Sequence, residues 1–195
     1  MSMPARLQPP ERWTRERVRA LRAQSMDGTR YELVGGALLV TPSPSGLHQE
    51  AVALLWAALR PYVQRQGIGL AGIAPRDVDF AAEETTQPDA FVVPPDEVDR
   101  YRGSEPVRTL LLAAEVISPS SARGDRVDKR QAYQRNRVSE YWIVDVGARV
   151  IERWHPTDDR PEIVTDRLIW TPAGTTEPFV LDLVAYFAEV FGERR

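Results

Sequence analysis

Two carboxylates lie within two short apolar segments of the chain. Glu115 is the single acid in the run LLLAAEVI, and Asp89 opens the run DAFVV directly after Pro88. A buried carboxylate is costly unless it is paired, hydrogen-bonded or bound to a metal. If the two runs are central strands of one sheet, each with its acid near one end, the sequence predicts a site with two carboxylates.

A lysine is the third candidate for chemistry. The chain has 25 lysine and arginine residues, and Lys129 alone is lysine. A compact ammonium on a flexible stem can act as a point charge beside a phosphoryl oxygen, a role that the planar guanidinium fills less well. The alternative is a solvated lysine on a helix face, in a chain that uses arginine almost everywhere else.

These residue types favour a hard metal ion. Carboxylate oxygens suit Mg²⁺ or Mn²⁺ better than zinc, and the chain has no cysteine and only two histidines. A Mg²⁺ held by Asp89 and Glu115 would polarise a phosphoryl oxygen and lower the pKa of a bound water, while Lys129 would stabilise the developing charge. The predicted reaction is metal-assisted hydrolysis of a phosphodiester. Nucleophilic catalysis is less favoured, since neither histidine has a serine and an acid at a recognisable spacing.

The elements that carry these residues are two strands and a helix. We expect strands at residues 89–93 and about 109–118, a loop containing Pro119 and Gly124, and a helix at about 125–135. Lys129 and Tyr133 are four residues apart and share a helix face, with Arg126 within one turn. Because the helix begins just beyond the strand of Glu115, a lysine reach of about 6 Å could bring its ammonium to the carboxylate pair.

The N-terminal part of the chain predicts an arm, a helix and a hairpin. Residues 1–13 are rich in proline, Thr14 can cap a helix at about 15–24, and residues 30–41 form two β-rich runs around Gly35-Gly36. Glu32 alternates with its apolar neighbours, and alternation alone predicts that it faces solvent.

The longest predicted helix covers residues 47–65. His48 lies four residues before Val52 and so faces the sheet with it, where a histidine is more often a hydrogen-bonded core residue than a ligand. Pro61 is expected to kink this helix or end its regular part. Residues 68–74 and 76–80 are predicted to form two strands, or one strand bent at Pro75. The rest of the chain is predicted to contain a surface loop or helical turn at 96–105, a hairpin through Gly147, short strands near 162–165, 167–171 and 179–181, and a helix at 183–191. This order predicts an α/β or α+β sandwich with a mixed sheet.

The composition and net charge narrow the classes of protein to which the chain can belong. The net charge of −3 gives no general electrostatic case for nucleic acid, although residues 123–137 are locally basic and residues 76–105 locally acidic. No apolar run approaches the length of about 18 residues needed to span a membrane, and the N-terminal residues lack the apolar core of a signal peptide. We therefore expect a cytoplasmic protein with no membrane partner, built as an arm and short helix (1–29) and a single domain (30–195).

A series of motifs resembles a known family. The motifs are the helix-opening His48 and the segments YELVGG, QPDAFVV, AAEVISPSS, DKRQAY and EYWIVD. Through them the chain resembles the bacterial Uma-two family of putative restriction endonucleases, which belongs to the PD-(D/E)XK nuclease superfamily. The resemblance covers roughly residues 31–145. It implies a restriction-endonuclease-like core with a mixed central β-sheet flanked by helices, here with extra C-terminal strands, and Mg²⁺-dependent cleavage of DNA.

The resemblance also implies roles for particular residues. Asp89 matches the PD acid and Glu115 the acid of the (D/E)XK element, while Glu32 and His48 become lining residues, Glu32 as a third metal-coordinating or water-positioning carboxylate. Two residues after Glu115, however, Ile117 occupies the position where the superfamily has lysine. We hypothesise that Lys129 on the following helix supplies the missing charge.

Two other functions stay open. One is a catalytically inactive, nuclease-like protein that binds nucleic acid, which the displaced lysine and the negative net charge favour. The other is an interaction module, in which the acids and Lys129 form a buried ion-pair network and a sheet edge makes a homodimer. A homodimer would also serve a nuclease that cuts both strands of DNA.

Overall fold

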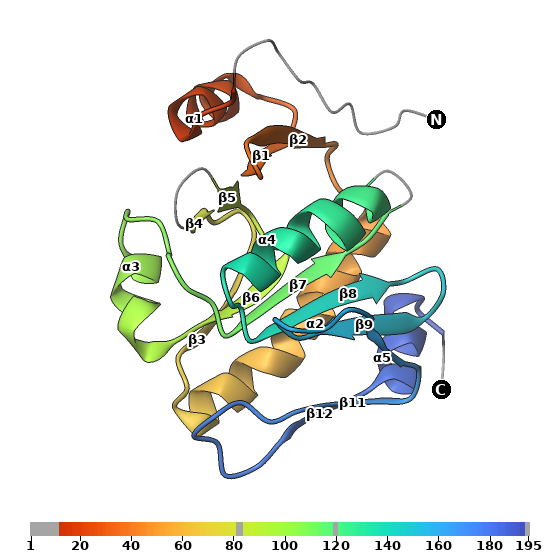
Figure 1. Ribbon diagram of the computed structural model, residues 1–195. Coiled ribbons are helices and arrows are strands. Elements are labelled where there is room, and N and C mark those ends of the chain that lie inside the picture. Colours follow the sequence, from red (N-terminus) through yellow and green to blue (C-terminus); the bar gives the residue numbers. More distant parts are fainter. Residues whose placement is uncertain (1–11, 81–83, 119–120, 194–195) are drawn as a thin grey trace.

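A mixed six-stranded sheet forms the centre of the molecule. The computed structural model describes residues 12–80, 84–118 and 121–193. In the described chain, the strand order is β10-β9-β8-β7-β6-β3, and β7 and β8 are its parallel pair (Figure 1). The strands are β3 (Leu70–Ile73), β6 (Ala90–Val93), β7 (Leu112–Val116), β8 (Glu140–Asp145), β9 (Val150–Trp154) and β10 (Glu162–Val164). The predicted fold class, with its mixed central sheet, is confirmed.

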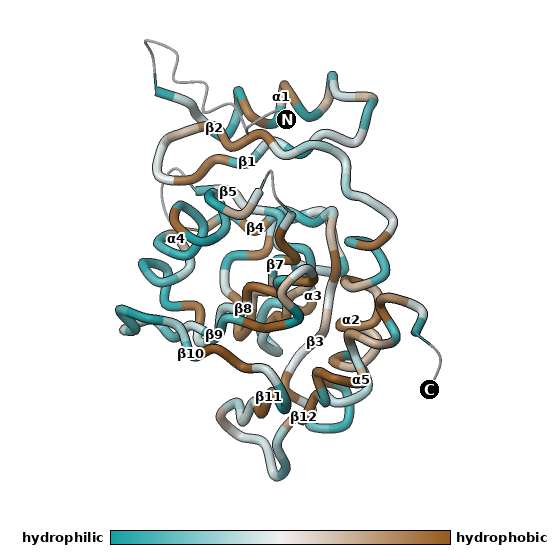
Figure 2. Tube along the Cα trace, turned by 90° about the vertical axis from the view of Figure 1, so that its right-hand side faces the viewer, coloured by the Kyte–Doolittle hydropathy of each residue, from teal (hydrophilic) through white to brown (hydrophobic). Residues whose placement is uncertain are grey.

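Helices cover both faces of this sheet. Helix α2 (Gly46–Gln66) and helix α5 (Leu183–Val190) lie on one face, and helix α4 (Arg130–Arg135) lies on the other (Figure 1). Since successive residues of a strand point to opposite faces, each central strand contributes to two cores. In β7, Leu112 and Ala114 pack toward α2, and Ala113 packs toward α4. Apolar residues accordingly concentrate in the central strands and in α2 and α5 (Figure 2).

Helix α2 is the longest helix of the described chain. The side chain of Ser45 caps its N-terminus by accepting a hydrogen bond from the His48 amide, and Gly67, with φ of 66°, ends it in the left-handed conformation. The helix passes through Pro61, with Leu59 and Tyr62 buried on either side of it. The prediction that Pro61 could end the regular helix is therefore wrong, because burial of the helix on the sheet outweighs the loss of one backbone hydrogen bond.

A second, smaller sheet lies above the end of the central one. Its order is β2-β1-β5-β4, and helix α1 (Arg15–Gln24) packs on it through Val18. The strands are β1 (Arg30–Val34), β2 (Ala37–Thr41), β4 (Val78–Asp79) and β5 (Thr85–Thr86). The predicted hairpin is confirmed, with Gly35 and Gly36 at φ of 59° and 76° as a tight turn between β1 and β2 requires.

The sequence did not predict how the chain divides between the two sheets. Residues 68–74 and 76–80 were expected as two strands or as one strand bent at Pro75, and they form two separate strands, β3 in the central sheet and β4 in the smaller one. Strand β5 was missed because it has only two residues, and its pairing with the distant strand β1 through Thr85 and Leu33 leaves no local signal. Most of the predicted N-terminal arm and Pro119 lie outside the described residues.

The remaining elements extend the fold at its edges. A helical turn (Pro95–Glu97) leads into α3 (Val98–Arg102), as the prediction of a surface loop or helical turn allowed. Strands β11 (Arg167–Trp170) and β12 (Phe179–Asp182) form a two-stranded sheet next to α5. No helix in the described parts of the chain is long and apolar enough to cross a bilayer.

The cap of helix α5 gives a prediction about stability. The Asp182 carboxylate accepts a hydrogen bond of 2.9 Å from the Ala185 amide at the start of the helix. Asp182→Ala is expected to lower the free energy of unfolding by about 1 kcal/mol, because an orphan helical N–H loses its acceptor. Urea denaturation measures the loss. Asp182→Asn, which preserves the acceptor, is the matched control, and an equal loss in both variants would contradict the capping role.

Candidate functional site

The register of two neighbouring strands brings Asp89 and Glu115 together. Strands β6 and β7 are antiparallel, with Ala90 opposite Ala114, so one further step along this register places Asp89 opposite Glu115. Residues directly opposite in such a pair have Cβ atoms about 4.5–5.5 Å apart. Both acids are almost fully buried, and Asp89 Oδ2 accepts a hydrogen bond of 2.8 Å from the Val116 amide. The carboxylate pair expected from the sequence therefore has a structural basis in the sheet.

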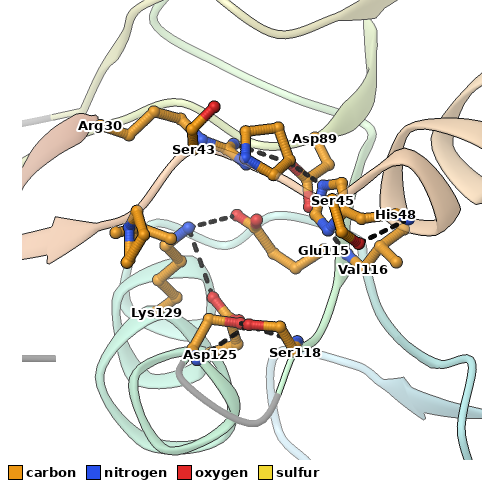
Figure 3. A pocket seen from close by; sticks show the side chains of 14 residues that line it. Arg30, Ser43, Ser45, His48, Asp89, Glu115, Val116, Ser118, Asp125 and Lys129 are labelled. Carbon is orange, nitrogen blue, oxygen red and sulfur yellow. Dashed lines mark hydrogen bonds and ion pairs between the residues drawn. The ribbon is translucent and has the colours of Figure 1, made fainter. Parts of the chain in front are cut away.

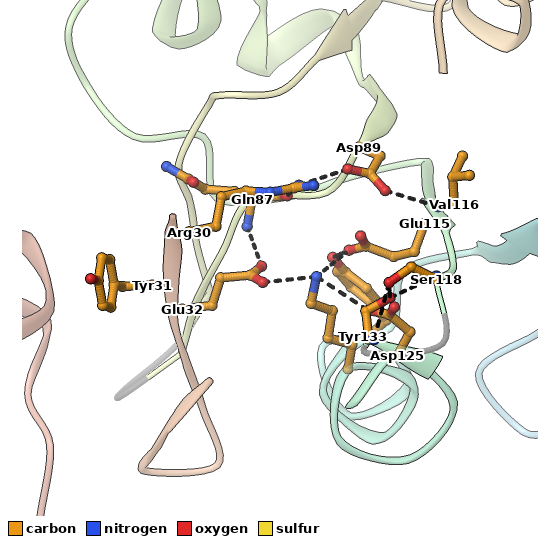
Figure 4. A network of polar contacts seen from close by, with 12 residues as sticks. Arg30, Tyr31, Glu32, Gln87, Asp89, Glu115, Val116, Ser118, Asp125 and Tyr133 are labelled. Carbon is orange, nitrogen blue, oxygen red and sulfur yellow. Dashed lines mark hydrogen bonds and ion pairs between the residues drawn. The ribbon is translucent and has the colours of Figure 1, made fainter. Parts of the chain in front are cut away.

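Lys129 lies at the centre of a group of carboxylates. Its ammonium Nζ is 2.8 Å from Glu32 Oε2, 3.0 Å from Glu115 Oε1 and 3.3 Å from Asp125 Oδ1 (Figure 4). The side chain is 3% exposed. The approach of the lysine to Glu115, inferred from connectivity, is thus found in the structure, and a solvated lysine is excluded.

A wide helical turn presents Lys129 to the sheet. Residues Gly124–Lys129 form a π-helical segment that continues into α4, in place of the regular helix expected there. Single π-turns within helices are frequent at functional sites. Asp125, Lys129 and Tyr133 follow one another at intervals of four, and Tyr133 donates a hydrogen bond of 2.9 Å to Glu115 Oε1. A Cβ on Gly124 would lie 3.1 Å from the Leu39 side chain, so glycine allows this helix to approach the hairpin closely.

Glu32 is buried, contrary to the expectation from alternation. Its side chain has no exposed surface, and Oε1 accepts a hydrogen bond of 2.7 Å from the Gln87 amide while Oε2 pairs with Lys129. The helix carrying Lys129 covers this face of the hairpin. Contacts between residues far apart in the sequence therefore decide its burial, which the pattern of strand β1 cannot reveal.

Asp89 has two basic partners. Its Oδ1 lies 2.6 Å from an Arg30 terminal nitrogen and 3.2 Å from His48 Nε2 (Figure 3). His48 thus faces the sheet, as predicted. Arg30 and Asp125 were not singled out from the sequence, although the signal was present: Arg30 is two residues before Glu32 on the same strand face, and Asp125 is four residues before Lys129 on one helix.

The cluster carries an excess of negative charge. Apart from His48, four carboxyl groups face two cations, which gives a formal charge of −2 when all four are ionised. The carboxylates are Glu32, Asp89, Glu115 and Asp125, and the cations are Arg30 and Lys129.

Burial and neighbouring charges separate the pKa values of these acids. Burial raises the pKa of Glu115 well above its usual value, against the attraction of Lys129 and with added repulsion from Asp89 and Asp125. Burial likewise raises the pKa of Asp125. For Asp89, burial acts in the same sense but is outweighed by the hydrogen bond with His48 and the charge of Arg30, which lower its pKa.

A cavity of about 190 Å³ opens beside the cluster (Figure 3). Its wall joins the loop before α2, the end of β7 and the π-helical segment. The charged residues that line it are Arg30, His48, Asp89, Glu115, Asp125 and Lys129. Three of the four carboxylates, Asp89, Glu115 and Asp125, therefore face the same space as the Lys129 ammonium, and this space is large enough for an ion with its water.

The carboxylates of the cluster suit a divalent cation, but they do not surround one completely. Hard carboxylate oxygens are ligands that suit Mg²⁺ or Mn²⁺, and Mg²⁺ usually keeps several waters beside one or two carboxylates. Within residues 12–80, 84–118 and 121–193, no group of three or more acids or histidines is arranged to hold a metal ion. The residues fit a cation bound by Asp89, Glu115 and water, and they do not fit an all-protein cage.

Comparison with known families identifies the chain. A sequence model of the Uma2 family, described as putative restriction endonuclease, matches residues 16–176. The chain belongs to the Uma2 family. The resemblance inferred from the motifs is thus confirmed, and the Uma2 match includes every residue of the cluster around Lys129. No curated protein matches the chain.

A solved structure supports the fold of this Uma2 chain. It is the crystal structure of a putative nuclease belonging to DUF820 from Anabaena variabilis ATCC 29413. The two chains share 17% sequence identity with a TM-score of 0.73, and the match covers 89% of this chain and 98% of the other. At this identity the likeness shows the fold alone.

The structure also accounts for the residue that departs from the superfamily pattern. Ile117 is partly buried and packs against the apolar core on the α4 side of the sheet. Lys129 reaches Glu115 from the helix instead. Arg126, one turn from Lys129, takes no part in the cluster, because it pairs with Asp145 and Glu152 at the outer side.

Proposed function

We propose that this Uma2 protein is a metal-dependent endonuclease that hydrolyses phosphodiester bonds of DNA. The observation that supports it is the convergence of Asp89, Glu115 and Lys129 on one cavity, with the lysine ammonium 3.0 Å from Glu115. Asp89 and Glu115 would hold Mg²⁺ or Mn²⁺. The ion would supply a polarised phosphoryl oxygen and a bound water of lowered pKa.

The other residues orient and balance these groups. Lys129 presents a positive charge beside the reacting phosphate, and such fixed charge in a buried site stabilises a transition state more strongly than the same charge in water. Glu32 and Asp125 hold the ammonium in place from two sides. Arg30 and His48 keep Asp89 ionised and fix its orientation.

A second candidate function rests on the pairing within the cluster. Both oxygens of Asp89 already accept contacts from the protein, and Lys129 has three carboxylate partners. Such a network can hold a fold together without catalysis. The protein would then bind nucleic acid without cutting it, or act as an interaction module in a homo-oligomer. For the nuclease, a homodimer would provide two sites for the two DNA strands.

Metal titration and plasmid cleavage together test the nuclease. We expect Mn²⁺ to raise the free energy of unfolding, by about 2.7 kcal/mol at a concentration 100 times the dissociation constant. Supercoiled plasmid should be nicked with Mg²⁺ or Mn²⁺, remain intact with EDTA, and be nicked again when the metal is restored.

Each alternative predicts a different outcome of the same experiment. Salt-sensitive DNA binding without metal binding or nicking would favour the inactive nucleic-acid-binding protein. A protein that binds neither millimolar Mn²⁺ nor DNA would favour the interaction module. Either result would contradict the nuclease.

A further inference from the structure

A second cavity, of about 600 Å³, adjoins the cavity of the carboxylate cluster. The two spaces have four wall residues in common: Arg30, Pro44, His48 and Asp89. A molecule in the second cavity would therefore contact the side chains that hold Asp89. This continuity makes it a neighbouring subsite of the proposed active site.

The walls of the second cavity are mainly apolar. Val52 and Ala53 of α2 line it, as do Ile73, Ala74 and Pro75 at the end of β3.

Polar groups complete the lining of this cavity. Thr29 and Gln87 contribute to the wall, and so does Arg22, whose terminal nitrogen Nη2 is buried without a hydrogen-bond partner among the described residues. Apolar walls with a few polar groups are typical of sites for small, largely apolar ligands, and the volume lies within their range of about 300–1,000 Å³.

We propose that this cavity receives an unpaired nucleobase of the DNA strand that is cleaved. The inference rests on the proposed function, since it takes the phosphodiester to lie at Asp89 and Glu115. A nucleobase has two apolar faces and a polar edge, which match the apolar walls and the polar groups of the lining. Its sugar and phosphate would continue into the first cavity through the shared wall at Arg30 and His48.

The proposal predicts the kind of DNA that is cut. A base inside a duplex cannot enter a cavity, so it must first leave the stack, and this costs least where the base is mismatched or the DNA is single-stranded. Single-stranded DNA or a duplex with one unpaired base should be cleaved at least about tenfold faster than a fully paired duplex.

Two substitutions on α2 provide a matched test. Ala53 lines the cavity and is exposed, so Ala53→Trp fills the space without disturbing the core. Ala57 is also exposed, lies one turn further along the helix and does not line the cavity, which makes Ala57→Trp the control. We expect Ala53→Trp to slow cleavage of single-stranded DNA by about tenfold or more. The control should stay within about twofold of the wild type, as exposed substitutions usually do.

Base insertion can be measured separately from cleavage. A DNA strand with a fluorescent adenine analogue at one unpaired position is titrated in EDTA, where no metal-dependent cleavage occurs. A change in emission that is lost in Ala53→Trp and kept in Ala57→Trp supports the subsite, even if no DNA is cut and the proposed function fails. Unchanged emission in all three proteins overturns the subsite, even if the plasmid is nicked. Equal cleavage of paired and unpaired DNA also overturns the subsite. The subsite is likewise overturned if the protein binds free deoxynucleotide but the emission of the labelled DNA strand does not change.

Discussion

Replacement of Glu115 by glutamine is expected to reduce metal-dependent DNA cleavage by at least about 100-fold, the scale of losing one group that stabilises charge in a transition state. Glu115 lies opposite Asp89 across two neighbouring strands and faces the same cavity. Glutamine has the same shape but no charge, so the site would lose one of the two carboxylates proposed to hold the metal. Stabilisation of the protein by added Mn²⁺ should disappear with it.

The same substitution is expected to leave the metal-free protein at least as stable as the wild type. Burial raises the pKa of Glu115 well above its usual value and the nearby acids add to this rise, so the charged form of Glu115 is disfavoured in the folded protein. Glutamine removes that charge, while its oxygen can still accept the hydrogen bonds that Tyr133 and Lys129 donate to Glu115. Loss of activity without loss of stability is the behaviour of a residue retained for function.

Asp145→Asn is the matched control for this substitution. Asp145 also ends a strand of the central sheet, but it pairs with Arg126 and does not line the cavity. Calorimetric titration of Mn²⁺, thermal unfolding and plasmid nicking should be measured on both variants and the wild type. If Glu115→Gln still binds Mn²⁺ as tightly as the control, Glu115 is not a ligand. If it is destabilised without any change in metal binding, its role is structural.

The carboxylate pair could be predicted because its geometry depends on neighbouring strands. An apolar run with one acid near its end predicts a buried strand. Because side chains alternate between the two faces of a strand, the position of the acid in the run determines the face on which it lies. Glu115 and Ile117 share a face by this rule, and in the structure Ile117 packs against the apolar core on the α4 side. The approach of Lys129 followed from the short connection between its helix and the strand of Glu115.

Burial of Glu32 and the partners of Asp89 could not be predicted in the same way. They depend on the smaller sheet, whose strand β5 pairs with β1 through Thr85 and Leu33, more than fifty positions apart. Only the packing of the Lys129 helix over the hairpin shows that Glu32 faces inward. The family resemblance drew attention to Glu32 and His48 but not to Arg30 or Asp125. Local periodicity describes a strand face, but what covers that face is decided by distant parts of the chain.

Replacement of Lys129 by methionine is expected to lower the free energy of unfolding by about 3–5 kcal/mol, the usual cost of removing one partner from a buried ion pair. Methionine fills most of the space of the lysine stem, so the loss reflects charge more than volume. Glu32, Glu115 and Asp125 would be left together without the ammonium that now lies within 3.3 Å of each. Thermal or urea unfolding measures the effect.

Arg126→Met is the matched control for this loss of charge. Arg126 lies three residues before Lys129 and also pairs with two acids, but its side chain is 38% exposed. Exposed ion pairs contribute little, so this variant should lose about 1 kcal/mol or less. If the two variants lose equal stability, the cluster around Lys129 is better solvated than its burial indicates.

A double substitution separates stability from chemistry at this site. In Lys129→Met with Glu32→Gln, one of the three carboxyl groups left without the ammonium becomes a neutral amide, and the glutamine oxygen can still accept the hydrogen bond from the Gln87 amide. Because the two residues are in contact, their effects should not add, and the double variant is expected to be more stable than Lys129→Met alone by about 1 kcal/mol or more. Cleavage is expected to be lost in Lys129→Met and to stay lost in the double variant, since no ammonium lies beside the phosphate in either. Recovery of cleavage together with stability would instead show that Lys129 serves only to hold the fold.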